Sequence, residues 1–176
     1  FAPAYVTPVA QAIPRIYRDL RFTSDKRPYK EHVAAVFPRL GGSRGACASF
    51  YVAVSHAGVV VQAGVSRPES GFLHSIRSRI ANEPGQLTRL LRRKAARTCF
   101  GDGRVAHLDG PLLVNVPRGF AKDDPAADLL RRKEFCLRAA LPRTLAGKPA
   151  LLPTLVEHFR AAGPLVAWLD EAGGTV

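Results

Sequence analysis

Residues 49–65 read Ser-Phe-Tyr-Val-Ala-Val-Ser-His-Ala-Gly-Val-Val-Val-Gln-Ala-Gly-Val, and they decide the predicted fold class. Two runs in this stretch, Ser49–Val54 and Gly58–Val65, are rich in the β-branched and aromatic residues that favour strands. The segment Ser55–Gly58 between them is typical of a tight turn. The stretch therefore predicts an antiparallel β-hairpin.

Two more strands are predicted in front of this hairpin. Residues 1–14 contain three prolines among small residues and are expected to form an extended arm that precedes a single domain, residues 15–176. Apolar and polar residues alternate over Arg15–Phe22, which predicts a strand, and a weaker alternation over Tyr29–Phe37 predicts a second one.

The rest of the chain is predicted to be mainly helical. Helices are predicted from Ser70 to near Pro84, over Gln86–Ala96, over Asp124–Cys136, and from Thr154 onward with a break at Gly163-Pro164, and a strand pair is predicted within Val105–Val116. Strands precede helices in blocks rather than alternating with them. The predicted fold is therefore α+β, with a mainly antiparallel sheet packed with helices.

Positive charge is concentrated in one part of the chain. Residues 1–100 hold 16 Lys and Arg against 5 Asp and Glu, whereas residues 101–176 hold 10 against 9, within a net charge of +12. Such an excess is expected of a surface that faces phosphate, nucleic acid or an acidic protein. A GC-rich coding sequence, which also raises the Arg content, explains the composition equally well.

The sequence also argues against a membrane-spanning protein and against a disulfide-rich or metal-binding one. No apolar run is long enough to span a membrane, and Cys47, Cys99 and Cys136 are too dispersed for a disulfide framework or a metal site. We expect buried thiols, no disulfide-linked partner, and a reducing intracellular location such as the mitochondrial matrix or another organelle. Since the chain has no Met, we expect a processed product or part of a longer chain.

A family resemblance rests on residues 15–30, which read Arg-Ile-Tyr-Arg-Asp-Leu-Arg-Phe-Thr-Ser-Asp-Lys-Arg-Pro-Tyr-Lys. Supporting pieces follow in order at residues 50–64, 76–77, 116–120, 124–130 and 164–169. The chain resembles the family called domain of unknown function 2461. It departs from the family at Glu31, and it lacks the apolar N-terminal helical segment that members usually carry. The resemblance implies a fold and a functional surface but no reaction.

A cluster of cations in this stretch is the leading candidate site. In the predicted strand Arg18 falls on the apolar face, where a charged group needs a partner. That partner is either a carboxylate such as Asp25, in a structural ion pair, or an anionic ligand. The anion-binding candidates are Arg15, Arg18, Arg21, Lys26 and Lys30.

A second cationic cluster lies on the predicted helix Gln86–Ala96 and just beyond it. Arg89, Arg92, Arg93 and Arg97 are spaced by three or four residues, which places several guanidinium groups on one helix face. They are candidates for contact with a nucleic acid or an acidic partner. A solvated helix face accounts for the same spacing.

Signatures of catalysis are missing from the sequence, so two hypotheses about function remain. The five His residues lack metal-ligand spacing, no nucleophile elbow or phosphate loop occurs, and Asp123-Asp124 fits a helix start. We predict no catalytic residue, cofactor or metal. The first hypothesis is a non-catalytic structural or accessory subunit of a larger assembly, such as an organellar ribosome or respiratory complex, with protein subunits and RNA as partners. The alternative is an enzyme or ligand-binding domain that holds an anionic substrate with the cations of residues 15–30.

Overall fold

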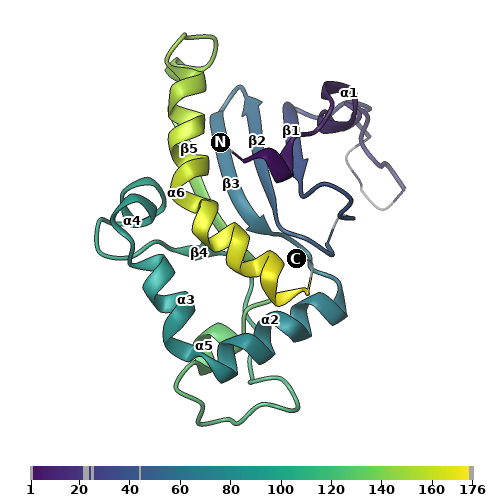
Figure 1. Cartoon of the computed structure of the whole chain (residues 1–176). Helices are drawn as coiled ribbons and strands as arrows, with labels where there is room; N and C mark the ends of the chain where they lie inside the picture. Colours follow the sequence, from purple (N-terminus) through teal and green to yellow (C-terminus); the bar gives the residue numbers. More distant parts are fainter. Residues whose placement is uncertain (1, 22–23, 25, 44, 175–176) are drawn as a thin grey trace.

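The computed structural model describes residues 2–21, 24, 26–43 and 45–174, and an antiparallel sheet lies at its centre (Figure 1). The order of the strands across the sheet is β1-β2-β3-β5-β4, and every neighbouring pair is antiparallel. The strands are β1 (His32–Pro38), β2 (Ser49–Ser55), β3 (Gly58–Val65), β4 (Leu108–Asp109) and β5 (Phe135–Leu141).

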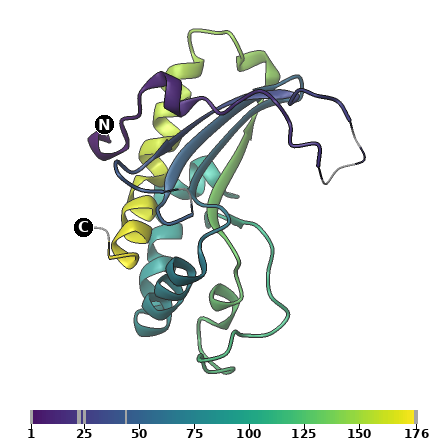
Figure 2. The same cartoon turned by 90° about the vertical axis from the view of Figure 1, so that its right-hand side faces the viewer.

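Helices gather on one face of this sheet. The long helix α6 runs across that face, and α2, α3 and α4 lie beside it (Figures 1 and 2). The helices are η1 (Pro3–Tyr5, 3-10), α1 (Val9–Ala12), α2 (Ser70–Asn82), α3 (Pro84–Leu91), α4 (Lys94–Phe100), α5 (Ala127–Leu130), η2 (Arg143–Leu145, 3-10) and α6 (Leu151–Ala172). Among the described residues, no helix covers the opposite face of the sheet, which we call the open face (Figure 2).

Alternation along the strands explains why the two faces differ. Phe50 of β2 lies opposite Ala63 of β3, and Ala63 lies opposite Leu137 of β5, so the three side chains share the covered face. All three are buried, and they join one hydrophobic core with Val166 and Leu169 of α6. Burial of the larger side chains among them, at roughly 1.5–3 kcal/mol each, holds α6 on the sheet.

The N-terminal arm is attached to the end of α6 through a buried carboxylate. Asp170, which is 1% exposed, accepts hydrogen bonds from the Tyr5 hydroxyl and from the backbone N–H of Ala48, the latter at 2.7 Å. The Tyr5 ring also packs edge-on against Phe50, with 5.1 Å between ring centroids. The arm therefore forms part of the packed structure in the range from Ala2 to Ala12.

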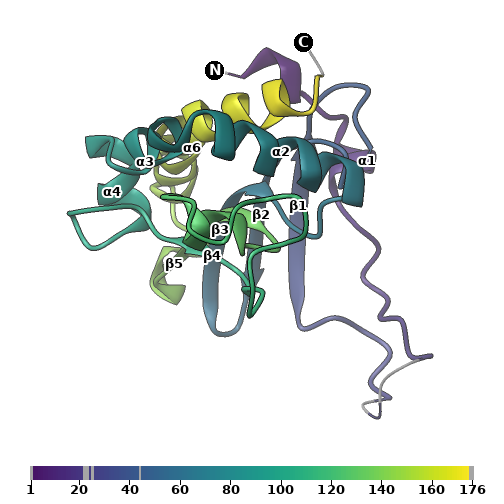
Figure 3. The ribbon, with the colours of Figure 1, turned by 90° about the horizontal axis from the view of Figure 1, so that it is seen from below.

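The predicted fold class is confirmed, as are the central hairpin and the helix that starts at Ser70. The predicted strand Arg15–Phe22 is wrong over its described residues. Residues 15–21 run outward from α1 and residues 26–31 lead back to β1, with one isolated bridge between Tyr17 and Tyr29. Both described parts extend beyond the rest of the chain (Figure 3). Alternation alone does not make a strand, because a strand needs a neighbour for its backbone hydrogen bonds. Phe22 lies outside the described residues.

The predicted helix Gln86–Ala96 is also wrong, because α3 ends at Leu91 and α4 begins at Lys94. Both Leu91 and Ala96 are buried. In a straight helix these two residues would be rotated from each other by about 500°, which is roughly 140° after a full turn. The break at Arg92-Arg93 lets the chain change direction so that both side chains reach the core.

The C-terminal half contains two more corrections. The predicted helix Asp124–Cys136 is reduced to α5, and Phe135–Leu141 forms β5 instead. A short apolar run such as Phe135–Leu137 fits a strand and a helix equally well, and pairing with β3 decides the outcome. The predicted strand pair within Val105–Val116 is reduced to the two-residue strand β4.

The last helix begins at Leu151 rather than Thr154, and it continues through Pro164. Proline costs roughly 3 kcal/mol inside a helix. Burial of Leu165, Val166 and Leu169 in the turns that follow offsets this cost.

Candidate ligand-binding site on the open face of the sheet

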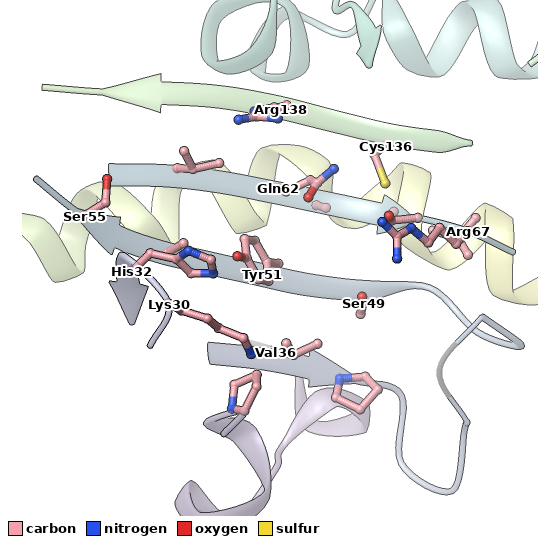
Figure 4. A pocket seen from close by; sticks show the side chains of 18 of the residues that line it. Lys30, His32, Val36, Ser49, Tyr51, Ser55, Gln62, Arg67, Cys136 and Arg138 are labelled. Atoms are coloured by element: carbon pink, nitrogen blue, oxygen red, sulfur yellow. The ribbon is translucent and has the colours of Figure 1, made fainter. Parts of the chain in front are cut away.

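A cavity of about 1120 Å³ lies over the open face, and we call it the open-face cavity. Figure 4 looks into it, with β1, β2, β3 and β5 side by side and α6 behind them. Its polar and ionisable lining includes Lys30, Glu31, His32, Ser49, Tyr51, Ser55, Gln62, Arg67, Cys136 and Arg138. This volume slightly exceeds the roughly 300–1,000 Å³ of cavities that hold drug-sized ligands, so the cavity has room for a small molecule.

The strand register orders these side chains in rows across the sheet. Val36, Tyr51, Gln62 and Arg138 lie opposite one another on successive strands and form the row that we call the polar ridge. Neighbouring strands are about 4.8 Å apart, so the ridge crosses roughly 14 Å of the sheet. It presents a phenol, an amide and a guanidinium group to the same space (Figure 4).

Arg67 stands at the end of the cavity where β3 finishes. Within the described ranges, its side chain has no hydrogen-bond or ion-pair partner, and the residue is exposed. Its φ of 53° is left-handed, the only positive φ of a non-glycine residue in the described part of the chain. The following Pro68 normally forces an extended conformation on the residue before it. Arg67 thus has a strained backbone conformation, and its side chain places an unpaired guanidinium group at the cavity.

Arg138 brings a second guanidinium group to the cavity. Its Nη1 atom lies 3.5 Å from Oδ2 of Asp109 on β4, and the two side chains are 53% and 47% exposed. An ion pair this exposed contributes roughly 0–1 kcal/mol, so the contact does not hold Arg138 away from a ligand.

Lys30 supplies a third cation from the chain that leads into β1. Its Nζ atom donates a hydrogen bond to the carbonyl oxygen of Arg15 at 2.7 Å. An ammonium group has three donors, so two remain for a ligand. Glu31 is the one acidic residue among those that line the cavity, and it pairs with Arg27.

The thiols in the lining are not suited to nucleophilic chemistry. Cys136 is 2% exposed. Burial raises the pKa of its thiol, and the nearby carboxylates of Glu134 and Asp109 raise it further, against a hydrogen bond with Gln62 that lowers it. Burial likewise raises the pKa of Cys47. Because the thiolate is the reactive form, both groups are unreactive at neutral pH.

Of the five predicted anion-binding residues, Lys30 alone lines the open-face cavity. Arg21 forms a bidentate pair with Asp19, at 3.0 Å and 2.7 Å, which lowers the pKa of that carboxyl. Lys26 donates to the carbonyl oxygen of Leu20. Arg15 is exposed, and the half-buried Arg18 is not a free cation. The predicted partner of Arg18, Asp25, lies outside the described residues.

The second predicted cluster lies on the opposite side of the core from the open face. Arg89 belongs to α3, Arg92 and Arg93 form the junction, and Arg97 belongs to α4; we call this group the α3–α4 corner. Arg89, Arg92 and Arg93 are exposed and Arg97 is half buried. The break between the helices means that they do not share one continuous helix face.

Sequence reasoning missed the residues that define the cavity, above all Arg67 and Arg138. One signal was present, because the predicted strand Ser49–Val54 alternates Ser49 and Tyr51 with apolar residues. That pattern indicates a sheet face that is not packed against helices. The positions of Arg67 and Arg138 depend on the pairing of β3 with β5, which the sequence does not reveal.

The whole chain was compared with known proteins. It matches the family described as conserved hypothetical protein (DUF2461) over residues 1–168. The protein belongs to this family. The resemblance carried by residues 15–30 is thereby confirmed, although the family description assigns no activity. No curated protein and no solved structure matched the chain significantly.

Two structural features are absent from the described residues of this DUF2461 member. None of the helices in the described ranges combines the length and apolar character needed to cross a membrane. Among the described residues, no group of three or more His, Cys, Asp or Glu side chains is placed to hold a metal ion.

Proposed function

We propose that this protein is a binding domain for a small anionic molecule that carries a carboxylate or a phosphate, held in the open-face cavity. One observation carries the proposal. Lys30, Arg67 and Arg138, the last of which belongs to the polar ridge, come from three separate segments and line one cavity. The three side chains lie at different borders of the cavity and together give it a positively charged lining (Figure 4).

Each type of side chain in the cavity offers a different kind of contact to the ligand. Arg67 and Arg138 each offer the planar fork of donors that matches a carboxylate or a phosphate. Lys30 adds a compact charge, and Ser49, Tyr51 and Gln62 line the space between them with neutral hydrogen-bonding groups. Charge-assisted hydrogen bonds are about twice as strong as neutral ones, so the cations supply most of the affinity.

The proposal assigns binding and no chemical step. The lining contains His32 and His56 at the end of the cavity away from Arg67, and its buried thiols have raised pKa values. An enzyme that acts on an anionic substrate in the same cavity is a variant of this proposal, and activity assays on other members of the family can test it.

Titration calorimetry with benzoate and with phenyl phosphate tests the proposal. We expect the double variant Arg67→Gln/Arg138→Gln to bind either probe at least tenfold more weakly than the wild-type protein, since a hydrogen bond to a charged group contributes roughly 1.5–3 kcal/mol. The matched control is Arg89→Gln/Arg92→Gln, which removes the same charge from the α3–α4 corner. Equal affinities for the wild-type protein and the cavity variant would refute the proposal.

A second candidate function is favoured by the α3–α4 corner. Arg89, Arg92, Arg93 and Lys94 are exposed, and residues 84–101 contain no Asp or Glu. A soluble surface usually mixes both signs of charge. We propose, as the alternative, that this corner docks the protein as an accessory subunit onto RNA or an acidic protein of a larger assembly. Phosphate contacts of this kind weaken steeply as salt is raised.

A further inference from the structure

We infer that the ligand of the open-face cavity is an amphiphile, in which the anionic group is attached to an unbranched hydrocarbon chain. This inference rests on the proposed function and adds the chemical class of the ligand. It comes from the size and polarity of the side chains in successive rows of the open face.

The row at the Arg67 end consists of small residues. Pro38, Ser49, Gly64 and Cys136 lie opposite one another across the four strands. Gly64 has no side chain, and Cys136 is almost fully buried, so this row forms a shallow trough. Arg67 borders the trough on one side and the polar ridge, which includes Arg138, borders it on the other (Figure 4).

The next row beyond the polar ridge is small and apolar. Ala34, Ala53, Val60 and Ala140 lie opposite one another, and not one of them has a polar side chain. Ala53 and Val60 line the open-face cavity, together with Ala57 from the turn that joins β2 to β3. Among the described residues, no helix covers this row, and the methyl groups of Ala53 and Val60 face the cavity.

Spacing along the strands sets the length of the ligand. Rows of one face are two residues apart, or roughly 7 Å, so the trough and the apolar row are roughly 13 Å apart. An anionic group held by Arg67 and Arg138 thus leaves room for a chain of medium length to cross the polar ridge and lie on Ala53 and Val60. A small anion such as acetate fills the trough and makes no contact with the apolar row.

If the hydrocarbon chain contacts the apolar row, the affinity of a series of carboxylates should rise with chain length. Burial of a methylene group contributes about 0.8 kcal/mol, which corresponds to a factor of about four in affinity for full burial. On an open sheet face each methylene is partly buried, and we expect a gain of about twofold for each one. The gain should begin beyond hexanoate, whose chain ends at the polar ridge, and extend to decanoate, whose chain approaches the apolar row.

The experiment is a calorimetric titration of the wild-type protein with acetate, hexanoate, octanoate, decanoate and decanol, each below its critical micelle concentration. We expect the affinity of the carboxylates to rise with chain length and decanol to bind at least tenfold more weakly than decanoate. The variant Val60→Thr keeps the shape of the side chain and should flatten the dependence on chain length. Val33→Thr is the matched control, because Val33 is 59% exposed on the other face of the sheet.

Each outcome of this titration decides one of the two proposals. Carboxylates that all bind equally, with affinity lost in Arg67→Gln/Arg138→Gln, would overturn the amphiphile and leave the anion site standing. Decanol that binds as tightly as decanoate, or a series in which no carboxylate binds, would overturn the anion site itself. A chain-length dependence that Val60→Thr leaves unchanged would place the hydrocarbon chain elsewhere and overturn the inference.

Discussion

Replacement of Gly64 by alanine should destabilise the protein by about 3 kcal/mol or more. Gly64 lies within β3 with a φ of +127°, and a Cβ atom added to it would lie 2.0 Å from the carbonyl oxygen of Phe135 on β5. The overlap is with backbone, so β3 and β5 must separate to relieve it. Chemical denaturation monitored by circular dichroism measures the loss as a shift of the unfolding midpoint.

The matched control is Gly41→Ala. Gly41 also has a positive φ, +75°, but a Cβ atom there would have no neighbour within 4 Å. This variant should therefore show the conformational cost alone, roughly 1–2 kcal/mol. A Gly64→Ala protein as stable as Gly41→Ala would show that β3 and β5 are not as closely paired as described.

Removal of the buried carboxylate by Asp170→Ala should cost about 3 kcal/mol. The variant leaves the Tyr5 hydroxyl and the Ala48 N–H without their acceptor, and it releases the N-terminal arm from α6. Tyr5→Phe removes one of these two hydrogen bonds and should cost roughly half as much. Equal stability of Asp170→Ala and the wild-type protein would contradict the described attachment of the arm.

The variant Asp170→Asn should have a lower free energy of unfolding than the wild-type protein, and this stability deficit should also depend on pH. Burial raises the pKa of Asp170 above its ordinary value of 3.8, against the hydrogen bonds from Tyr5 and Ala48 and the charge of Arg39, which lower it. The folded protein thus binds this proton more tightly than the unfolded chain does. The resulting stabilisation is complete below pH 3.8 and is lost as the pH rises through the raised pKa. Asp170→Asn lacks this titration, so its deficit should shrink as the pH rises toward neutrality, and a deficit that grows with pH would contradict the direction of the shift.

Local patterns predicted the parts of the fold that depend on neighbours in sequence. The β2–β3 hairpin followed from its strand-forming residues and turn, and the α+β class followed from the order of strands and helices. β5 was missed because Phe135–Leu141 becomes a strand through its pairing with β3, far away in the chain. Continuity of α6 through Pro164 was missed because core burial outweighs a local helix breaker.

The candidate site depends even more on residues that are far apart in the sequence, so local patterns predicted less of it. Cations in residues 15–30 were visible as a group, yet the segment folds out between α1 and β1 and satisfies several of its charges internally, as in the Asp19–Arg21 pair. Lys30 reaches the cavity because it lies next to the start of β1. Arg67 and Arg138 become part of one site when the sheet forms, and each looks like an ordinary surface arginine in the sequence.

The most direct test of the open-face cavity is a titration followed by two-dimensional NMR, in which backbone amide shifts of the wild-type protein are recorded with benzoate and then with a short uridine oligonucleotide. We expect benzoate to move the amides of Ser49, Gly64 and Cys136, together with those of Gln62 and Arg67 beside them, and to leave Arg89–Arg97 unmoved. Benzoate shifts that gather at the α3–α4 corner, or their absence from the open face, would contradict the proposed site. If the oligonucleotide shifts only the amides of Arg89–Arg97 and benzoate shifts no amide of the open face, the docking function replaces the proposed site.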